Sequence, residues 1–144
     1  MPSPEGYRTW TARWRGGLAS EVSGRGHVVL ADEPPEAGGE DTGPMPTELL
    51  AAGLASCFLA AVAWAARKRR IEVEDLEVDV TPFRAPGEPR HGRYEVVVRS
   101  STPRAELEPA FELATRYCWV SNTLRPPPEI DYRLEAPGDA AASP

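Results

Sequence analysis

Apolar and polar residues alternate near the N-terminus, which is the pattern of β-strands with one buried face. Trp10, Ala12 and Trp14 alternate with Thr11 and Arg13, and Tyr7 precedes them, so the aromatic side chains are predicted to share one face of a strand. Glycine pairs after this segment predict turns between successive strands. The strands are expected at residues 7–15, 18–22 and 27–30, with turns at Gly16-Gly17 and around Gly24 and Gly26.

Residues 46–69 carry the strongest helical pattern of the chain. Pro46 suits the first helical position, Glu48 lies in the first turn, and the basic residues 67–70 follow at the other end. Alanines surround the apolar positions on nearly every side, which predicts a helix packed on more than one face at the centre of the fold. The apolar stripe is expected to comprise Leu50, Leu54, Cys57, Ala61 and Ala65 (or Trp64).

A run of Asp, Glu, Gly and Pro occupies residues 31–46, before this helix, and shows no apolar periodicity. It predicts a long loop. Loops of this length inside a compact domain are usually functional or mobile.

The second half of the chain alternates strand and helix patterns. Strands are expected around residues 76–80 and 94–99, joined in antiparallel fashion through the turn-rich segment 82–92. A helix is expected to begin near Ala105, with Pro109 in its first turn, where a missing N–H costs least. Its apolar face comprises Leu107, Phe111, Ala114 and Cys118.

Three consecutive prolines, residues 126–128, end the helical region. The alternation of Ile130, Tyr132 and Leu134 predicts one last strand before a small-residue tail, residues 136–144, which is expected to fray. The order of elements indicates an α+β fold with mainly antiparallel sheet. We expect residues 1–144 to form a single domain.

Length and charge narrow the possible functions. The chain has 144 residues, 41% of them hydrophobic and 26% charged, which is typical of a soluble globular domain. Its net charge of −6 argues against a general nucleic-acid-binding protein, which needs a basic surface. No segment is expected to span a membrane, because the longest apolar run, 49–66, is mostly alanine, contains Gly53 and Ser56 and is followed by Arg67. The N-terminus lacks a secretory pattern. We therefore expect a cytoplasmic protein with no membrane partner, whose two cysteines are thiols, metal ligands or a redox pair rather than a structural disulfide.

The two cysteines are the candidate nucleophiles. Cys57 lies on the apolar stripe of the long helix, and Cys118 lies at the end of the second helix. From their placement alone, they are either small buried hydrophobic residues or a redox-active thiol pair. The spacing of His27 and His91 relative to the cysteines contains none of the short ligand pairs of a zinc site. Glu48 either favours the helix dipole or orients an arginine near the thiol.

Two motifs give the sequence a family resemblance. The segment Gly43-Pro-Met-Pro-Thr-Glu-Leu-Leu50 precedes a helix with small residues before its cysteine, and Tyr117-Cys-Trp-Val-Ser-Asn-Thr-Leu124 surrounds the second cysteine. Both motifs, and the order of elements, resemble the OsmC/Ohr family of thiol peroxidases. The resemblance covers about residues 7–135, nearly the whole chain.

The resemblance implies an intertwined homodimer in which each long helix packs centrally and two active sites lie at the interface. It implies that Cys57 is the peroxidatic thiolate, which attacks an organic hydroperoxide, and that Cys118 is the resolving thiol. The resulting disulfide is reduced by an external dithiol, either a lipoyl protein or a thioredoxin-like protein, so no bound cofactor or metal is expected. The role is defence against oxidative or osmotic stress.

The sequence departs from the family pattern at the residues that activate the first cysteine. The family glutamate ten positions before that cysteine is Thr47 here, and the nearest carboxylate is Glu48. No arginine occurs in residues 31–46, which leaves Arg15 and Arg25 as candidate activators. These departures place the chain in the general OsmC-like group. They keep open a second function, a small-ligand-binding or stress-associated protein with little peroxidase turnover.

Overall fold

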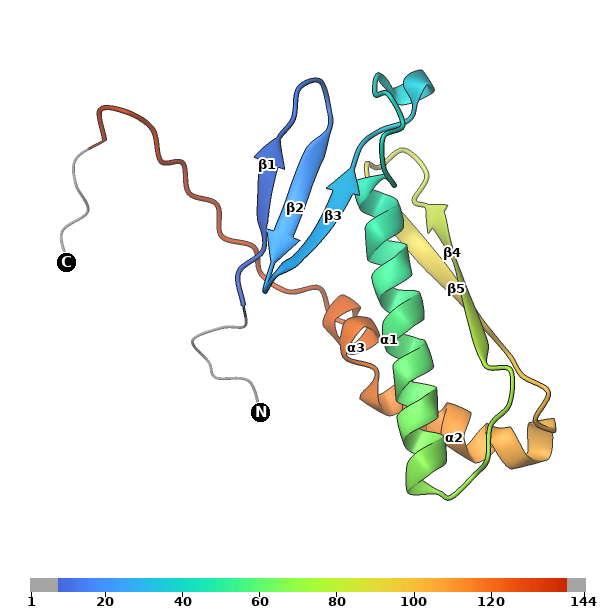
Figure 1. The fold of residues 1–144 in the computed structure, drawn as a ribbon. Helices are drawn as coiled ribbons and strands as arrows, with labels where there is room; N and C mark the ends of the chain where they lie inside the picture. Colours follow the sequence, from blue (N-terminus) through green and yellow to red (C-terminus); the bar gives the residue numbers. More distant parts are fainter. Residues whose placement is uncertain (1–7, 140–144) are drawn as a thin grey trace.

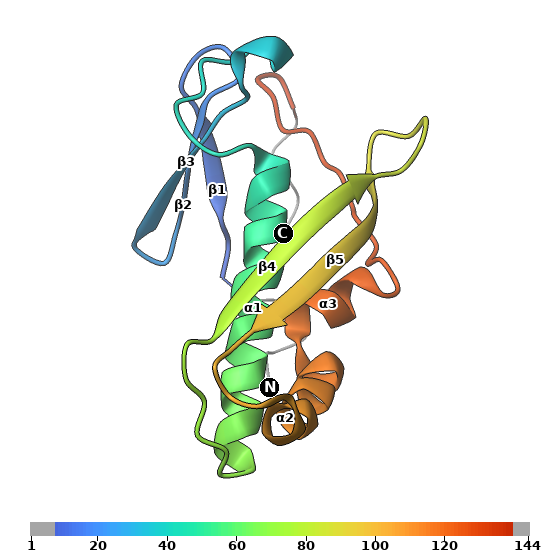
Figure 2. The same cartoon turned by 90° about the vertical axis from the view of Figure 1, so that its right-hand side faces the viewer.

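The computed structural model describes residues 8–139, and the strand start at Tyr7 and the tail residues 140–144 lie outside this range. Two antiparallel sheets flank a long central helix, which confirms the α+β fold expected from the sequence (Figures 1 and 2). The elements in chain order are β1 (Thr11–Trp14), β2 (Ser20–Gly24), β3 (His27–Ala31), the 3-10 helix η1 (Pro35–Ala37), α1 (Pro46–Lys68), β4 (Glu77–Arg84), β5 (His91–Arg99), α2 (Arg104–Tyr117) and α3 (Trp119–Leu124).

Helix α1 begins and ends where the sequence predicts, and it buries the predicted face in part: Leu54 and Ala65 are buried as expected. Its core side chains are Ala51, Leu54, Phe58, Val62, Ala65 and Ala66. Leu50, which was expected in the apolar stripe, is 45% exposed, and Cys57 is half-buried. One residue along a helix turns the direction of a side chain by about 100°. Because small apolar residues surround α1, its own sequence does not define which face packs, and the neighbouring elements decide.

The β4–β5 hairpin covers the core face of α1 (Figure 2). Val78 pairs with Val98 and Val80 with Val96 across the two strands, and all four contact the cluster that holds Leu54, Phe58 and Val62. The expected turn at residues 82–92 is too long, since residues 82–84 and 91–92 belong to the strands. Pro82 has no backbone N–H to donate. It is tolerated because both strands of a two-stranded sheet are edge strands, in which such a position can face away from the partner strand.

Helix α2 packs across the C-terminal half of α1 through small side chains. Ala110 of α2 is fully buried in a cluster with Ala65 and Ala66 of α1. The helix starts at Arg104, so Pro109 lies in the second turn, and the expectation of a first-turn proline is wrong. The helix accepts the loss of one backbone hydrogen bond there.

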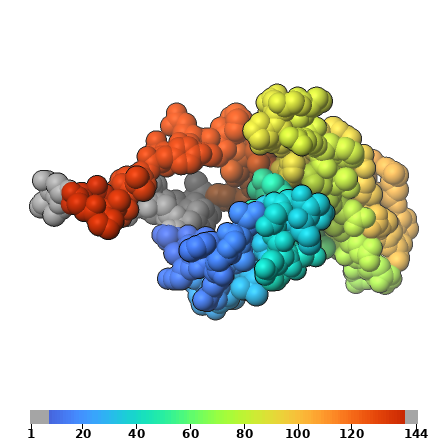
Figure 3. Space-filling model, turned by 90° about the horizontal axis from the view of Figure 1, so that it is seen from above, coloured from blue at the N-terminus to red at the C-terminus, as the bar shows by residue number. Residues whose placement is uncertain are grey.

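The last predicted strand does not form within this chain. Residues 126–136 have no regular secondary structure, and Ile130, Tyr132 and Leu134 are 67%, 89% and 86% exposed. Seen from above, this segment extends away from the rest of the molecule (Figure 3). A strand pattern becomes a strand only where another strand supplies hydrogen-bond partners, and none of the described strands pairs with it.

The loop before α1 is organised around a buried carboxylate. Asp32 is 1% exposed, and its oxygens accept hydrogen bonds from the backbone N–H groups of Glu33, Glu40 and Thr42 and from the Thr42 hydroxyl. These hydrogen bonds, that from the Thr42 hydroxyl above all, hold the pKa of Asp32 below its ordinary value. Gly39 is required beside it, because a Cβ atom would lie 1.9 Å from the Glu33 carbonyl oxygen.

Replacing Asp32 by asparagine is expected to destabilise the protein most at neutral pH. The unfolded carboxyl titrates near pH 3.9, and its native pKa is lower, so its stabilising contribution is complete above that pH and is lost as the pH falls through the native pKa. Urea unfolding of wild type and Asp32→Asn should therefore differ at pH 7, and the difference should shrink below about pH 4. Glu36→Gln, in the exposed part of the same loop, should match wild type at both pH values.

Helix α1 is long and apolar enough to cross a membrane by length and composition alone, contrary to the expectation that no segment qualifies. The difference arises because the many alanines of the run count as apolar. The contacts of α1 with the hairpin and with α2 show that it is the core helix of a soluble protein.

Candidate functional site

The fold brings the two cysteines into one apolar cluster. Cys118 is completely buried among Leu54, Phe58, Val62 and Ala114, and Cys57 packs against the same cluster from α1. Both are free thiols. A half-buried Cys57 beside a buried Cys118 places one thiol within reach of a small reagent and shields the other from solvent.

The second motif fixes Cys118 at a break between two helices. Cys118 is extended (φ −72°, ψ 112°), so α2 ends and α3 begins around it. Its backbone N–H donates to the Ala114 carbonyl, and its carbonyl accepts from the Asn122 N–H and the Ser121 hydroxyl. The Thr123 hydroxyl donates to the Trp119 carbonyl. Ser121 therefore ties the first turn of α3 to the residue that carries the thiol, and Thr123 bonds back to the first residue of α3.

Glu48 has a structural partner. Its Oε2 accepts a hydrogen bond of 2.8 Å from the Met45 N–H, which caps the N-terminus of α1. Nine residues separate it from Cys57, so the two side chains leave α1 about 180° apart. The structure thus gives Glu48 a capping hydrogen bond in the first turn, where its charge was expected to favour the helix dipole, and its proposed role beside the thiol stays a prediction.

The two candidate arginines lie in the turns of the β1–β2–β3 sheet. Arg15 follows β1 and forms an ion pair with Glu21. Arg25 lies in the β2–β3 turn with a positive φ of 52°. The sheet stands beside α1 (Figure 1), and within residues 8–139 no hydrogen bond joins a guanidinium to either sulfur atom. The role of Arg15 or Arg25 beside Cys57 therefore stays a prediction.

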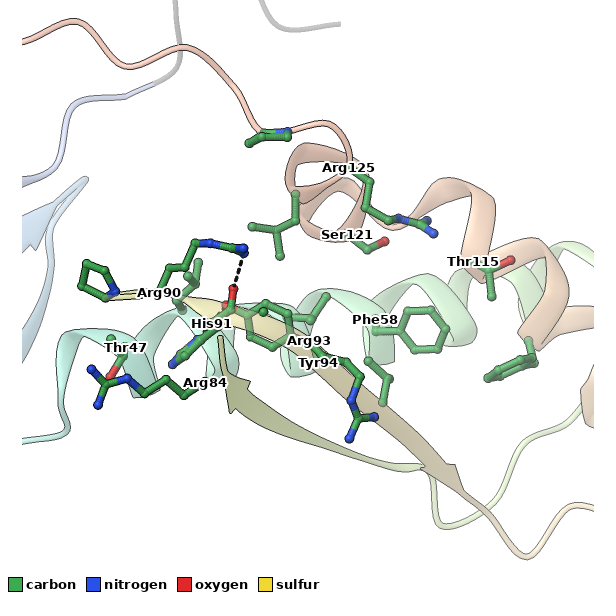
Figure 4. A pocket seen from close by; sticks show the side chains of 18 residues that line it. Thr47, Phe58, Arg84, Arg90, His91, Arg93, Tyr94, Thr115, Ser121 and Arg125 are labelled. Carbon is green, nitrogen blue, oxygen red and sulfur yellow. Dashed lines mark hydrogen bonds between the residues drawn. The ribbon is translucent and has the colours of Figure 1, made fainter. Parts of the chain in front are cut away.

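A cavity of about 1170 Å³ opens next to the cysteine cluster, between α1, the hairpin and the helices α2 and α3 (Figure 4). Leu54 and Phe58 belong to both the cluster and the cavity wall. The remaining apolar wall includes Phe111, whose ring meets Phe58 edge-to-face at 5.8 Å. Neither cysteine lines the cavity itself, so it adjoins the thiols without containing them.

Basic residues lie along two sides of this cavity, and the guanidinium of Arg93 points away from it, over the Phe83 ring. Arg84, Arg90 and Arg93 come from the hairpin, and Arg125 comes from the end of α3 on the other side (Figure 4). Arg90 donates 2.6 and 3.2 Å hydrogen bonds to Glu88, which keep the pKa of the Glu88 carboxyl below its ordinary value.

A polar pair lies on the hairpin side of the cavity. The Tyr94 hydroxyl lies 2.9 Å from His91 Nδ1, and burial raises the pKa of Tyr94. The sequence analysis missed this group of basic and polar residues. The sequence pattern that could have indicated it is the three arginines within segment 84–93. These arginines come close together only through the register of the hairpin.

Comparisons with known proteins agree with this architecture. The family model OsmC, which describes OsmC-like proteins, matches residues 38–133, two thirds of the chain. No curated protein matches the chain significantly.

Solved structures share the fold at low sequence identity. An OsmC-like protein from Mycoplasma pneumoniae has a TM-score of 0.72 and 20% identity, over 85% of this chain and 90% of that one. The organic hydroperoxide resistance protein OsmC from Legionella pneumophila has a TM-score of 0.62 and 23% identity, over 86% and 93%. The organic hydroperoxide resistance protein OhrB of Bacillus subtilis has a TM-score of 0.61 and 24% identity, over 85% and 93%.

Proposed function

The chain belongs to the family of OsmC-like proteins, and we propose on that premise that it reduces organic hydroperoxides with Cys57 as the peroxidatic thiol and Cys118 as the resolving thiol. One observation carries the proposal: two cysteines far apart in the sequence share one apolar cluster, one half-buried and the other fully buried. Relatives of the same fold include organic hydroperoxide resistance proteins.

The proposed reaction has two chemical steps. The Cys57 thiolate attacks the terminal peroxide oxygen, the O–O bond breaks, and the leaving alkoxide takes a proton to become an alcohol. Cys57 is then a sulfenic acid. The Cys118 thiol attacks that sulfur, an S–S bond forms and water leaves. Thiol–disulfide exchange with an external dithiol, on a lipoyl or thioredoxin-like protein, returns two electrons and restores both thiols. Such a cycle fits a cytoplasmic protein in oxidative or osmotic stress defence.

We propose that the working form is an intertwined homodimer. Large apolar side chains stay exposed over much of the chain, including Trp14 at 78% and Val28 at 61% in the N-terminal sheet and Leu59 on the uncovered face of α1. Exposed apolar patches of this kind mark interfaces. A second copy also offers Arg15 or Arg25 a route to Cys57 that the single chain lacks, because a cation beside a thiol favours the thiolate.

A charge on the uncovered face of α1 is expected to separate the two copies. Leu59→Asp should sediment at 15.7 kDa, whereas wild type should sediment at twice that mass, because an interface cannot bury an unpaired carboxylate cheaply. Ala105→Asp, an exposed site in the first turn of α2, is the matched control and should sediment as wild type. A monomeric wild type would contradict the homodimer.

Thiol titration after oxidation tests the enzymatic proposal. Excess cumene hydroperoxide should remove both titratable thiols of wild type and leave a Cys57–Cys118 disulfide that mass spectrometry detects in the peptide digest. Hydrogen peroxide should act more slowly, since an apolar surrounding favours an organic peroxide. Two thiols that survive the organic peroxide would exclude the reaction.

A second candidate function is binding of a small ligand with little peroxide turnover. Thr47 in place of the family glutamate favours it, and so does the absence of a guanidinium bonded to either sulfur within residues 8–139. Surviving thiols in the same titration would support this second function.

A further inference from the structure

We propose that the Tyr94 hydroxyl gives the leaving alkoxide its proton during peroxide reduction, and that His91 positions this hydroxyl. The proposal rests on the proposed function, which leaves that proton without a donor. It assigns a further catalytic residue, Tyr94, and a positioning residue, His91, to the reaction at Cys57.

Tyr94 and Cys57 approach the same apolar cluster from two elements. Tyr94 lies on β5 and Cys57 on α1, and both pack against the buried cluster that contains Leu54. Three residues along a helix turn the direction of a side chain by about 300°, so Cys57 leaves α1 within about 60° of Leu54. Leu54 and Tyr94 also line one wall together. Tyr94 and Cys57 therefore flank Leu54, and a small peroxide that reacts at Cys57 lies between α1 and β5.

His91 prepares the Tyr94 hydroxyl as a donor. The hydroxyl oxygen lies 2.9 Å from His91 Nδ1, and the two rings meet edge-to-face at 5.3 Å (Figure 4). With its hydrogen on Nδ1, the imidazole donates to the tyrosine oxygen and leaves the hydroxyl hydrogen free for a substrate. The same hydrogen bond stabilises the tyrosinate that remains after the proton has moved. Burial raises the pKa of Tyr94, so the hydroxyl keeps its proton until a strong base such as an alkoxide forms.

The other polar groups of this region are less suited to give a proton. The Ser121 and Thr115 hydroxyls each donate to the backbone carbonyl three residues earlier. Thr47 lies ten residues, or about 15 Å along the helix, from Cys57, and a guanidinium does not give up its proton. The Tyr94 hydroxyl, by contrast, has only the imidazole as a hydrogen-bond partner within residues 8–139.

The proposed step balances in atoms and electrons. The Cys57 thiolate takes the terminal oxygen with its hydrogen and becomes a sulfenic acid, and the O–O bond breaks with its electron pair on the oxygen that stays bound to carbon. The Tyr94 proton moves to that oxygen, which gives an alcohol and a tyrosinate. Water then returns a proton to Tyr94 and leaves hydroxide.

Leaving groups of different basicity separate proton donation from packing. Cumene hydroperoxide expels an alkoxide, which needs a proton, whereas peracetic acid expels a carboxylate, a group whose acid has a pKa of about 4. The parent protein for the test is Cys118→Ser, which isolates the first oxidation, and stopped-flow measurement gives the second-order rate of Cys57 oxidation. Added to this parent, Tyr94→Phe should slow the reaction with cumene hydroperoxide about 10²-fold and leave the rate with peracetic acid within about twofold.

Two further variants complete the set. His91→Gln should slow the reaction with cumene hydroperoxide about fivefold, as expected for the loss of one hydrogen bond to the donor, and should leave peracetic acid unaffected. Tyr132→Phe is the matched control, because it removes the same hydroxyl from a side chain that is 89% exposed. It should match the parent with both oxidants.

Tyr94→Phe with the parent rate toward cumene hydroperoxide would overturn the proposal. Equal slowing with both oxidants would also overturn it, since it would indicate a change in packing or at the thiol. A retained reaction with peracetic acid shows that the variant is folded and that its Cys57 is reactive. A parent protein that fails to react with cumene hydroperoxide would instead contradict peroxide reduction itself, and the role of Tyr94 with it.

Discussion

Replacing Cys57 by serine is expected to abolish peroxide reduction: the second-order rate with cumene hydroperoxide should fall about 10³-fold or more, which is a rise of at least about 4 kcal/mol in the activation barrier. A serine hydroxyl is a far weaker nucleophile toward peroxide oxygen than a thiolate. Stopped-flow measurement of peroxide consumption under single-turnover conditions gives this rate directly.

Cys118→Ser is the matched variant, because it removes the other sulfur of the same cluster. It should keep the first oxidation, consume one peroxide per chain and then stop, since no disulfide can form. A Cys57 sulfenic acid should accumulate and be trapped by dimedone. If Cys57→Ser consumed peroxide at the wild-type rate, the assignment of the peroxidatic thiol would be wrong.

Truncating Phe58 to alanine is expected to cost about 3–5 kcal/mol in the free energy of unfolding. Phe58 is 5% exposed and lies where α1, the hairpin and α2 meet, with its ring against Phe111. Its loss removes apolar contacts on three sides and leaves a cavity. Urea unfolding followed by tryptophan fluorescence at a single protein concentration measures the change, since a homodimer makes stability depend on concentration.

Phe83→Ala deletes the same side chain at a surface site. Phe83 is 39% exposed on β4, and Arg93 lies 3.9 Å from its ring centroid. Its replacement should cost less than about 1 kcal/mol. Comparable losses for the two variants would show that Phe58 is not a centre of the core.

The boundaries of α1 could be predicted from the residues at its two ends, but the face that it buries could be predicted only in part. The helix begins at Pro46, with Glu48 in its first turn, and ends at Lys68, with Arg67 and Lys68 in its last turn. Each of these signals lies within a few residues of the boundary that it marks.

The stripe that α1 buries is only partly the predicted one, with Leu54 and Ala65 in common. Leu50 and Cys57 were expected inside, while Phe58 and Val62 occupy the core. The facing hairpin and α2 choose that face, and they come from residues much later in the chain.

Most of the predicted strands form, but the last one does not. The segments around Val22, Val29, Val78 and Val97 find partners within the chain and form strands. Residues 130–134 have an equally clear alternation and form none, because no neighbouring strand meets them. Alternating apolar and polar residues show that a segment can form a strand. Whether it does depends on a second segment that supplies the hydrogen-bond partners.

By itself the sequence determined the boundaries of α1, the class of fold, both thiol motifs and the family resemblance, since each depends on residues a few positions apart. Only the tertiary structure decided that Cys57 and Cys118 share one cluster and that arginines from the hairpin and from α3 lie beside one cavity. Those facts depend on the direction in which a side chain leaves its element and on contacts between distant segments. No local pattern carries that information.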